Sequence, residues 1–145
     1  RDFENWHWTW DNERGAATEA QLDVWSIRSM DGGRTWQDRR HILDGYCGAI
    51  QDIIVTDSGA VVVPVEFYID NMGRHATRTW RSTDDGASWE PSNIVDLGGH
   101  GHHDGAMEAT LAETADGRVM MLLRTSLDRF WRAWSFDDGR TWRRL

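Results

Sequence analysis

The sequence has 145 residues, a formal net charge of −8, ten tryptophans and one cysteine. The acidic balance argues against a nucleic-acid partner, which would need a concentrated basic face. A single cysteine excludes a disulfide framework within the chain and a CxxC metal site, and no apolar run approaches the roughly 18 residues of a membrane span.

The first predicted strand is residues 3–10, in which tryptophans alternate with polar residues. Its three indoles share one face, where packing between sheets or a stacking platform for sugar rings are the two alternatives. A polar loop at residues 11–20 separates it from the second predicted strand, residues 21–29.

A motif of pattern S-x-D-x-G-x-[ST]-W occurs at residues 29–36, 82–89 and 135–142, with successive starts 53 residues apart. Its Asp can accept hydrogen bonds from backbone N–H groups two or three residues on, and its Gly tolerates a positive φ. We therefore expect each copy, called a box below, to close a tight turn between antiparallel strands and to serve a structural role.

The segments between the boxes predict strand pairs joined by Ser58-Gly59 and Asp116-Gly117 turns, each followed by a strand that leads into the next box. These strands are residues 50–57, 60–67, 76–82, 108–115, 118–125 and 129–135. With a strand after each box, every 53-residue unit holds four antiparallel strands, A to D, which is typical of a β-propeller blade. Pro64 donates no ladder hydrogen bond and predicts a bulge in its strand.

The predicted fold is all-β: part of a six-bladed β-propeller, with about two and a half four-stranded antiparallel blades in a single partial domain. The blades are roughly residues 1–44, 45–97 and 98–145. Since the chain begins with arginine and ends inside a strand-like segment, we expect it to be a piece of a longer protein whose remaining blades complete the ring.

Strand alternation places the boxes and A–B turns at one end of the blades and the longer connections at the other, and long loops on a rigid scaffold are where sites are usually built. Glu108 begins strand A of the third unit and Arg124 ends its strand B, so both belong to this open-loop end. The two residues form a candidate site for a charged sugar; a structural ion pair is the alternative.

The boxes and the blade length resemble those of the sialidase superfamily, the Asp-box or bacterial neuraminidase repeat family. The segment Met107–Thr125, which contains Glu108 and Arg124, is similar to the central blade of that family. The resemblance implies that Glu108 is the acid that partners a nucleophilic tyrosine. It also implies that Arg124 is one of three arginines that hold the substrate carboxylate.

The first unit resembles the loop that carries the acid catalyst in this family, in which an arginine is followed five residues later by an aspartate. Arg14 takes the place of the arginine and Glu19 that of the aspartate. The resemblance implies that Arg14 binds substrate and that Glu19 protonates the leaving group, with glutamate as a departure from the pattern. For Glu19, a solvated loop acid is the alternative.

Asp52 and His103 complete the candidate substrate-binding residues. Asp52 opens strand A of the second unit, and His103 belongs to a loop with His100 and His102 just before Glu108. The H-x-H-H spacing matches no well-defined metal motif, so substrate contact or a plain loop is favoured over metal binding. We predict no cofactor and no metal ion.

The resemblance implies a sialidase-like exo-glycosidase that hydrolyses terminal sialic acid or a related acidic sugar from glycoconjugates with retention, in a secreted or periplasmic protein. The tyrosine nucleophile and two clamp arginines are expected outside residues 1–145, so this chain alone should be inactive. Two alternatives stay open: a non-catalytic propeller that binds glycans or proteins, and a glycosidase or lyase of the same fold with another substrate.

Overall fold

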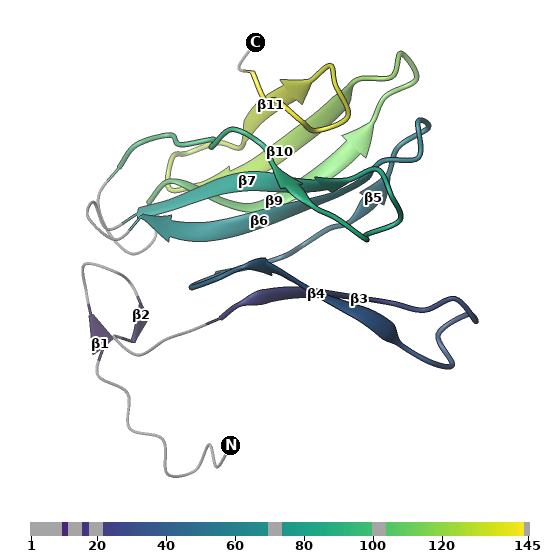
Figure 1. The fold of residues 1–145 in the computed structure, drawn as a ribbon. Helices are drawn as coiled ribbons and strands as arrows, with labels where there is room; N and C mark the ends of the chain where they lie inside the picture. The colour runs from purple at the N-terminus through teal and green to yellow at the C-terminus, as the bar shows by residue number, and fades with distance from the viewer. Residues whose placement is uncertain (1–9, 12–15, 18–21, 70–73, 100–103, 144–145) are drawn as a thin grey trace.

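The computed structural model describes residues 10–11, 16–17, 22–69, 74–99 and 104–143 (Figure 1). All regular elements in these ranges are β-strands, arranged in four antiparallel sheets. No helix capable of crossing a membrane occurs in these ranges. The prediction of an all-β chain is confirmed.

The smallest sheet pairs β1 (Trp10–Asp11) with β2 (Ala16–Ala17). Residues 11–20 were expected to form a loop, so that expectation is wrong for Asp11 and for the two residues of β2. Of the predicted strand at residues 3–10, Trp10 lies within the described residues and the remainder lies outside them.

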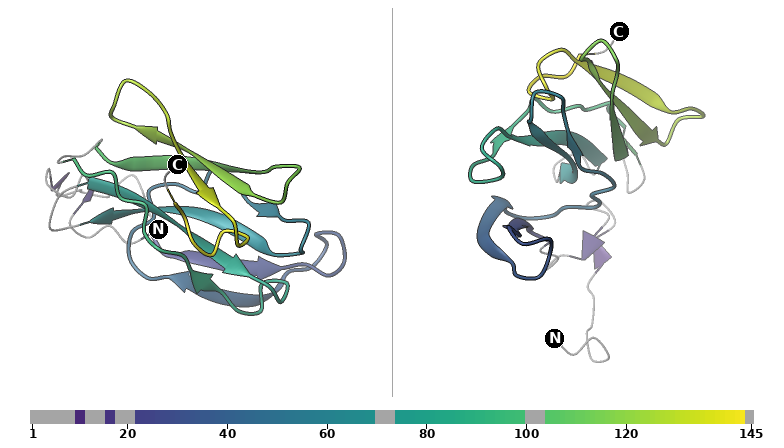
Figure 2. Two further views of the ribbon diagram at one scale, coloured as in Figure 1. Left: turned by 90° about the horizontal axis from the view of Figure 1, so that it is seen from above. Right: turned by 90° about the vertical axis from the view of Figure 1, so that its right-hand side faces the viewer.

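The other three sheets follow one another in chain order, and the second lies between the first and the third (Figures 1 and 2). The first sheet contains β3 (Val24–Arg28) and β4 (Gln37–Leu43). The second contains β5 (Ile54–Val55), β6 (Val61–Ile69), β7 (Arg74–Ser82) and β8 (Glu90–Pro91). The third contains β9 (Ala106–Glu113), β10 (Val119–Thr125) and β11 (Trp131–Ser135).

Pro64 lies inside β6 without the predicted bulge and pairs with Thr79 in an unbroken register. Two residues further on, the backbone N–H of Glu66 donates to Ala49 O, across the edge of β6 that faces away from β7. Because backbone groups alternate along a strand, the Pro64 nitrogen faces the same edge and removes no hydrogen bond to β7. The predicted strand at residues 50–57 is reduced on this edge to the two residues of β5.

The three boxes form the same hydrogen-bonded turn, but the N–H that donates to the Asp in all three lies four residues on rather than the predicted two or three. In the third box, Ser135 Oγ donates to Asp137 Oδ1 (2.8 Å) and accepts from Gly139 N (2.8 Å). Asp137 also accepts from the backbone N–H (2.8 Å) and the hydroxyl (2.7 Å) of Thr141. The equivalent four contacts recur in the other two boxes.

These hydrogen bonds make chain stability depend on pH. The N–H and hydroxyl of Thr35 lower the pKa of Asp31 to about 2, and the hydroxyl and N–H of Ser88 do the same for Asp84. A folded pKa below the unfolded value of about 3.9 stabilises the folded state above about pH 4, and this contribution is lost as the pH falls toward about 2.

We therefore expect the urea midpoint of unfolding to fall between about pH 4 and pH 2. Carboxyl NMR titration should give pKa values of about 2 for Asp31 and Asp84. Asp84→Asn keeps an oxygen acceptor but cannot titrate, so it should weaken the pH dependence. An unchanged dependence in this variant would contradict the assignment.

The tryptophans of the second and third boxes each hydrogen-bond to the preceding sheet. Trp89 Nε1 donates to Ser26 Oγ (3.1 Å) on β3, and Trp142 Nε1 donates to Thr79 Oγ1 (2.7 Å) on β7. The two tryptophan donors are 53 residues apart in the sequence, and so are the two hydroxyl acceptors, so the contact between sheets repeats with the period of the boxes. Trp36, at the same position of the first box, is 60% exposed.

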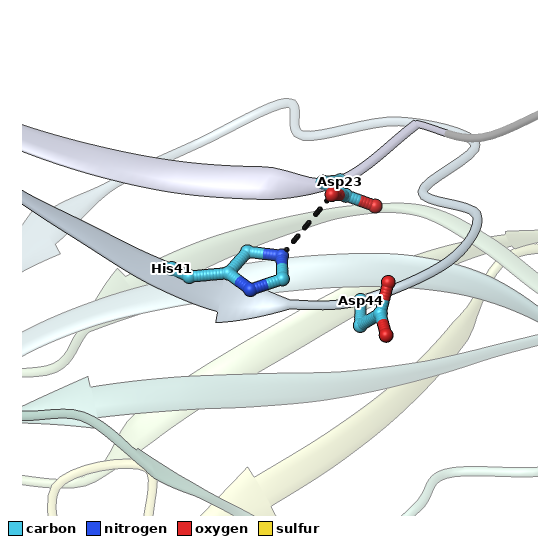
Figure 3. A group of neighbouring side chains, drawn as sticks. All are labelled: Asp23, His41 and Asp44. Carbon is cyan, nitrogen blue, oxygen red and sulfur yellow. Dashed lines mark ion pairs between the residues drawn. The ribbon is translucent and has the colours of Figure 1, made fainter.

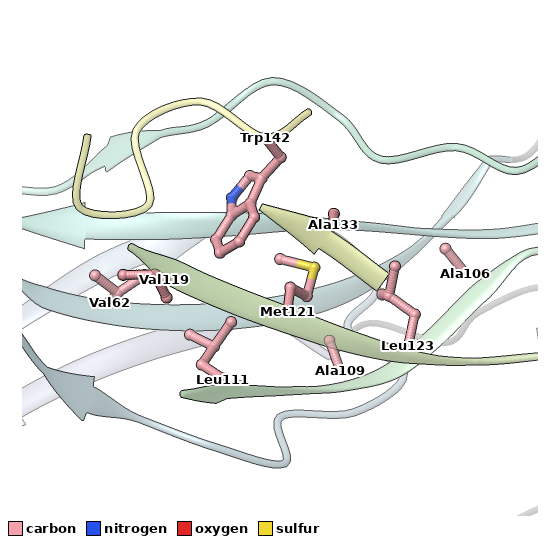
Figure 4. Packing of buried hydrophobic residues seen from close by; sticks show 9 residues of the cluster. All are labelled: Val62, Ala106, Ala109, Leu111, Val119, Met121, Leu123, Ala133 and Trp142. Carbon is pink, nitrogen blue, oxygen red and sulfur yellow. The ribbon is translucent and has the colours of Figure 1, made fainter. Parts of the chain in front are cut away.

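The core lies between consecutive sheets rather than within one. Val62 of β6 packs with side chains of the third sheet, among them Leu111, Met121 and Trp142 (Figure 4). A smaller cluster joins Val24 of β3 to side chains of the second sheet. The second sheet thus packs one face against the third sheet and the other against the first, which is how blades of a repeat protein are stabilised.

The two ends of the sheets differ in character. The boxes and the turns that join β5 to β6 and β9 to β10 lie together, on the right in Figure 1. The start of β9, the end of β10 and the start of β11 lie at the opposite end, where the candidate catalytic residues were predicted.

Candidate functional site

Glu108 and Arg124 lie together at the end of the third sheet opposite the boxes. Arg124 Nη1 donates to Glu108 Oε1 at 2.6 Å, and the two side chains are 46% and 40% exposed, respectively. The residues belong to the adjacent strands β9 and β10, whose pairing is irregular between Leu122 and Arg124. The pair is thus open to solvent, and its two charges would face a ligand at this end.

Glu108 has a left-handed backbone, with φ of 42°. Few residues other than glycine adopt this conformation, and such strain persists where the surroundings hold it. Here the Glu108 N–H donates to Glu66 Oε2 at 2.8 Å. The second sheet therefore fixes the backbone that aims the Glu108 carboxylate.

Glu66 is a residue of the candidate site that sequence reasoning missed. It lies on β6, is only 6% exposed, and its Oε1 lies 2.7 Å from His75 Nδ1 of β7. A buried carboxylate must be paired or hydrogen-bonded. Glu66 is paired with His75 and accepts a hydrogen bond from the backbone N–H of Glu108. The available signal was a lone acid within the otherwise apolar run Val61–Ile69.

The segment that leads into Glu108 is anchored at alternate residues. His75 N donates to Asp104 O (2.9 Å), and Thr77 Oγ1 donates to Ala106 O (2.9 Å). With the bond from Glu108 to Glu66, these contacts tie the start of β9 to β6 and β7 over five residues. The position of Glu108 therefore depends on the docking of the third sheet against the second.

Asp52 is turned toward the third sheet. Its Oδ2 accepts from Thr110 Oγ1 and from Leu111 N, both at 2.8 Å, and its Oδ1 accepts from Ile53 N. Burial tends to raise the pKa of Asp52, but the hydrogen bonds from Leu111, Thr110 and Ile53 outweigh it and lower the pKa below 3.8. The carboxylate thus links the segment before β5 to β9, and substrate binding by Asp52 stays a prediction.

The other candidate residues, Glu19, Arg14 and His103, lie outside the described residues. The structure therefore brings together Glu108 and Arg124 from the predicted set and adds Glu66. The assigned roles of all these residues remain predictions.

A shallow pocket of about 220 Å³ lies beside Arg124. Its other lining residues belong to the end of β10 and the connection to β11: Thr125, Leu127, Asp128, Arg129 and Phe130. A larger hollow of about 660 Å³ lies between β3 and β6. It is lined by aliphatic side chains, Trp25 and Trp89, together with Arg28, Asp52 and Asp85. Of the candidate residues, Arg124 lines the smaller pocket and Asp52 lines the larger one, whereas Glu108 lines neither. The smaller pocket is therefore the one that adjoins the Glu108–Arg124 pair.

Cys47 is not suited to nucleophilic chemistry. Burial, and then the negative charge of Glu66, raise the pKa of its thiol to about 11. Its Sγ is directed to Ala49 O at 3.5 Å. Because the thiolate is the reactive form, this cysteine is a structural residue.

Comparisons with known proteins agree with this architecture. The profile described as BNR repeat-like domain matches residues 7–145. A solved structure of a protein of unknown function from Dyadobacter fermentans DSM 18053 is similar, with a TM-score of 0.65 and 21% sequence identity over 87% of this chain. That likeness concerns the fold alone, and the chain spans 40% of the length of that structure.

No curated protein sequence matches the chain significantly. The repeat profile, however, covers nearly all of it, including the three boxes and both strands that carry Glu108 and Arg124. The resemblance inferred from the boxes is thereby confirmed, and the chain belongs to the BNR repeat-like domain family.

Proposed function

We propose that this chain contributes part of the active site of a sialidase-like exo-glycosidase that releases a terminal acidic sugar. The observation that carries the proposal is the exposed pair of Glu108 and Arg124, 2.6 Å apart at the end of the sheets opposite the boxes. The strained backbone of Glu108 supports it, because such strain concentrates at functional sites.

In the proposed reaction, Glu108 takes the proton of a tyrosine nucleophile supplied by the remaining part of the protein. A neutral tyrosine suits attack at an anomeric carbon that bears a carboxylate, because a carboxylate nucleophile would be repelled. Tyrosine is a known exception to the two-carboxylate scheme of retaining glycosidases. Glu19 protonates the leaving oxygen in this scheme.

Arg124 binds the carboxylate of the sugar through its planar guanidinium. Among the residues that the structure describes, only its Nη1 is hydrogen-bonded, to Glu108. Nη2 and Nε can therefore take part in a two-donor contact with a carboxylate. The neighbouring pocket, with the exposed ring of Phe130, offers a surface for the rest of the ligand.

Replacing Arg124 tests this proposal in the full-length protein. Arg124→Lys keeps the charge but loses the two-donor fork, so KM for an aryl sialoside should rise by at least ~10-fold, the effect of one charged hydrogen bond. Arg118→Lys is the matched control, because Arg118 lies in the same β9–β10 hairpin at the box end and pairs with Asp116 (2.7 Å). KM should be unchanged in the control.

Two outcomes would refute the proposal. If the full-length protein hydrolyses no acidic glycoside yet binds one, and Arg124→Lys weakens that binding, the site is a glycan-binding site without catalysis. If Arg124→Lys changes neither KM nor binding, Arg124 has no role in recognising an acidic sugar.

A further inference from the structure

A second group of chemically active side chains lies in the first sheet, away from the Glu108 site. Asp23 directly precedes β3, His41 belongs to β4, and Asp44 directly follows it. One ligand atom from each residue lies within 4.8 Å of those of the other two (Figure 3). His41 Nε2 and Asp23 Oδ2 are 3.2 Å apart. The group is at the end of β3 and β4 opposite their box.

Contacts outside the group hold two of its members in place. Asp23 Oδ1 accepts a hydrogen bond from Gly45 N (3.0 Å), which leaves Oδ2 directed at His41. The His41 ring stacks on the Trp25 indole, with centroids 4.2 Å apart and 21° between the planes. Ligands fixed by such outer contacts are a feature of protein metal sites.

The backbone around the group is also tied together. Leu22 N donates to Gly45 O (2.6 Å), and Cys47 N donates to Leu22 O (3.0 Å). This cross-connection holds the segment after β4 against the start of β3. The carboxylates of Asp23 and Asp44, which are 21 residues apart in the sequence, are therefore kept on one side of the sheet end.

We propose that Asp23, His41 and Asp44 bind one divalent transition-metal ion of the Zn²⁺ type. One imidazole and two carboxylates form a donor set that suits zinc, whereas calcium prefers oxygen ligands alone. The 3.2 Å between His41 Nε2 and Asp23 Oδ2 matches the ~3.3 Å edge of a tetrahedron with bonds of about 2.0–2.1 Å.

The partial exposure of the group fits this coordination. The side chains of His41 and Asp23 are 38% and 20% exposed, so water can complete the ligand shell. A metal ion here would join the start of β3 to the end of β4 and stabilise a sheet of two strands. This site departs from the sequence-based expectation of no metal and does not depend on the proposed glycosidase activity.

The test is calorimetric titration of ZnCl₂ into the metal-free, full-length protein, together with its melting temperature. We expect one equivalent to bind and to raise Tm. His41→Gln and Asp44→Asn should each weaken binding by at least ~10-fold, the lower limit seen for losing even outer-shell partners. CaCl₂ at the same concentration should bind more weakly than ZnCl₂.

Asp128→Asn is the matched control, because Asp128 is a highly exposed acid that pairs with its neighbour Arg129. Zinc binding should be unchanged in this control, and near-UV circular dichroism should be native in all variants. Binding that persists in both His41→Gln and Asp44→Asn would overturn the proposal, as would its loss only when His100, His102 and His103 are replaced. Absence of zinc binding would leave His41 and Asp23 as a simple ion pair and also overturn it.

Discussion

Glu108→Gln is expected to lower kcat of the full-length protein on an acidic glycoside by at least ~100-fold, because glutamine cannot accept a proton from the nucleophile. The substitution preserves the size of the side chain, and its amide oxygen can still accept from Arg124 Nη1. The backbone bond from Glu108 N to Glu66 Oε2 is untouched. The loss should therefore appear in kcat, with Tm unchanged and substrate binding largely retained.

Glu113→Gln is the matched control for this experiment. Glu113 is on the same strand but at the box end, where its Oε2 accepts from Asp57 N at 2.7 Å. Glutamine can keep this contact, and no catalytic role is proposed there, so kcat should match that of the wild type. If Glu108→Gln also leaves kcat intact, the pair of Glu108 and Arg124 is a structural ion pair, the alternative that the sequence left open.

Gly105→Ala should destabilise the protein by about 3 kcal/mol or more, which places it among the most damaging single substitutions. Gly105 has a φ of 106°, and a Cβ at this position would lie 1.9 Å from the carbonyl oxygen of His75. That atom belongs to the backbone of β7, so relief requires the two sheets to move apart. The free energy of unfolding in urea measures the loss.

Gly117→Ala separates the steric effect from backbone strain. Gly117 also has a positive φ, of 76°, but nothing lies within 4 Å of the added Cβ. Its cost should be limited to the strain of a left-handed alanine, about 1–2 kcal/mol. Equal destabilisation by the two substitutions would mean that the close approach of Gly105 to His75 does not determine stability.

Gly105→Ala should also impair catalysis in the protein that remains folded. The adjacent Asp104 and Ala106 accept hydrogen bonds from β7 through their backbone carbonyl groups, and Glu108 follows two residues later in the same segment. Moving this segment would displace the Glu108 carboxylate. A variant with native kcat per folded molecule would show that Glu108 is positioned independently of this contact.

The sequence alone determined the box turns and the β-rich fold. Each box is complete within eight residues, and Asp137 finds its partners Ser135 and Thr141 inside the motif. Such local hydrogen bonds need no tertiary contact, so pattern and spacing predicted the turns, although the N–H that donates to the Asp in all three boxes lies four residues on rather than two or three. The strands β6, β7, β9 and β10 were predicted for the same reason, since their apolar patterns and Gly-containing turns are local.

Prediction failed where backbone pairing depends on a neighbouring strand. The strand expected at residues 50–57 is reduced to β5, since Pro64 of β6 has no N–H to donate to the residues that precede β5. Asp11 of β1 and both residues of β2 lie where a loop was expected. Two-residue strands leave almost no periodic signal, so their existence is decided by the partner strand.

The site of Glu108 and Arg124 was predicted in part from the sequence and in part depends on how the sheets pack. Strand alternation was enough to place Glu108 and Arg124 at one end of a hairpin, because both belong to the same local unit. Glu66 is 42 residues from Glu108 in the sequence and meets it only when the second and third sheets dock. His41 likewise meets Asp23 through the register of β3 and β4 and the turn that returns Gly45 to Asp23. These contacts depend on the relative placement of separate strands and sheets, which no local pattern encodes.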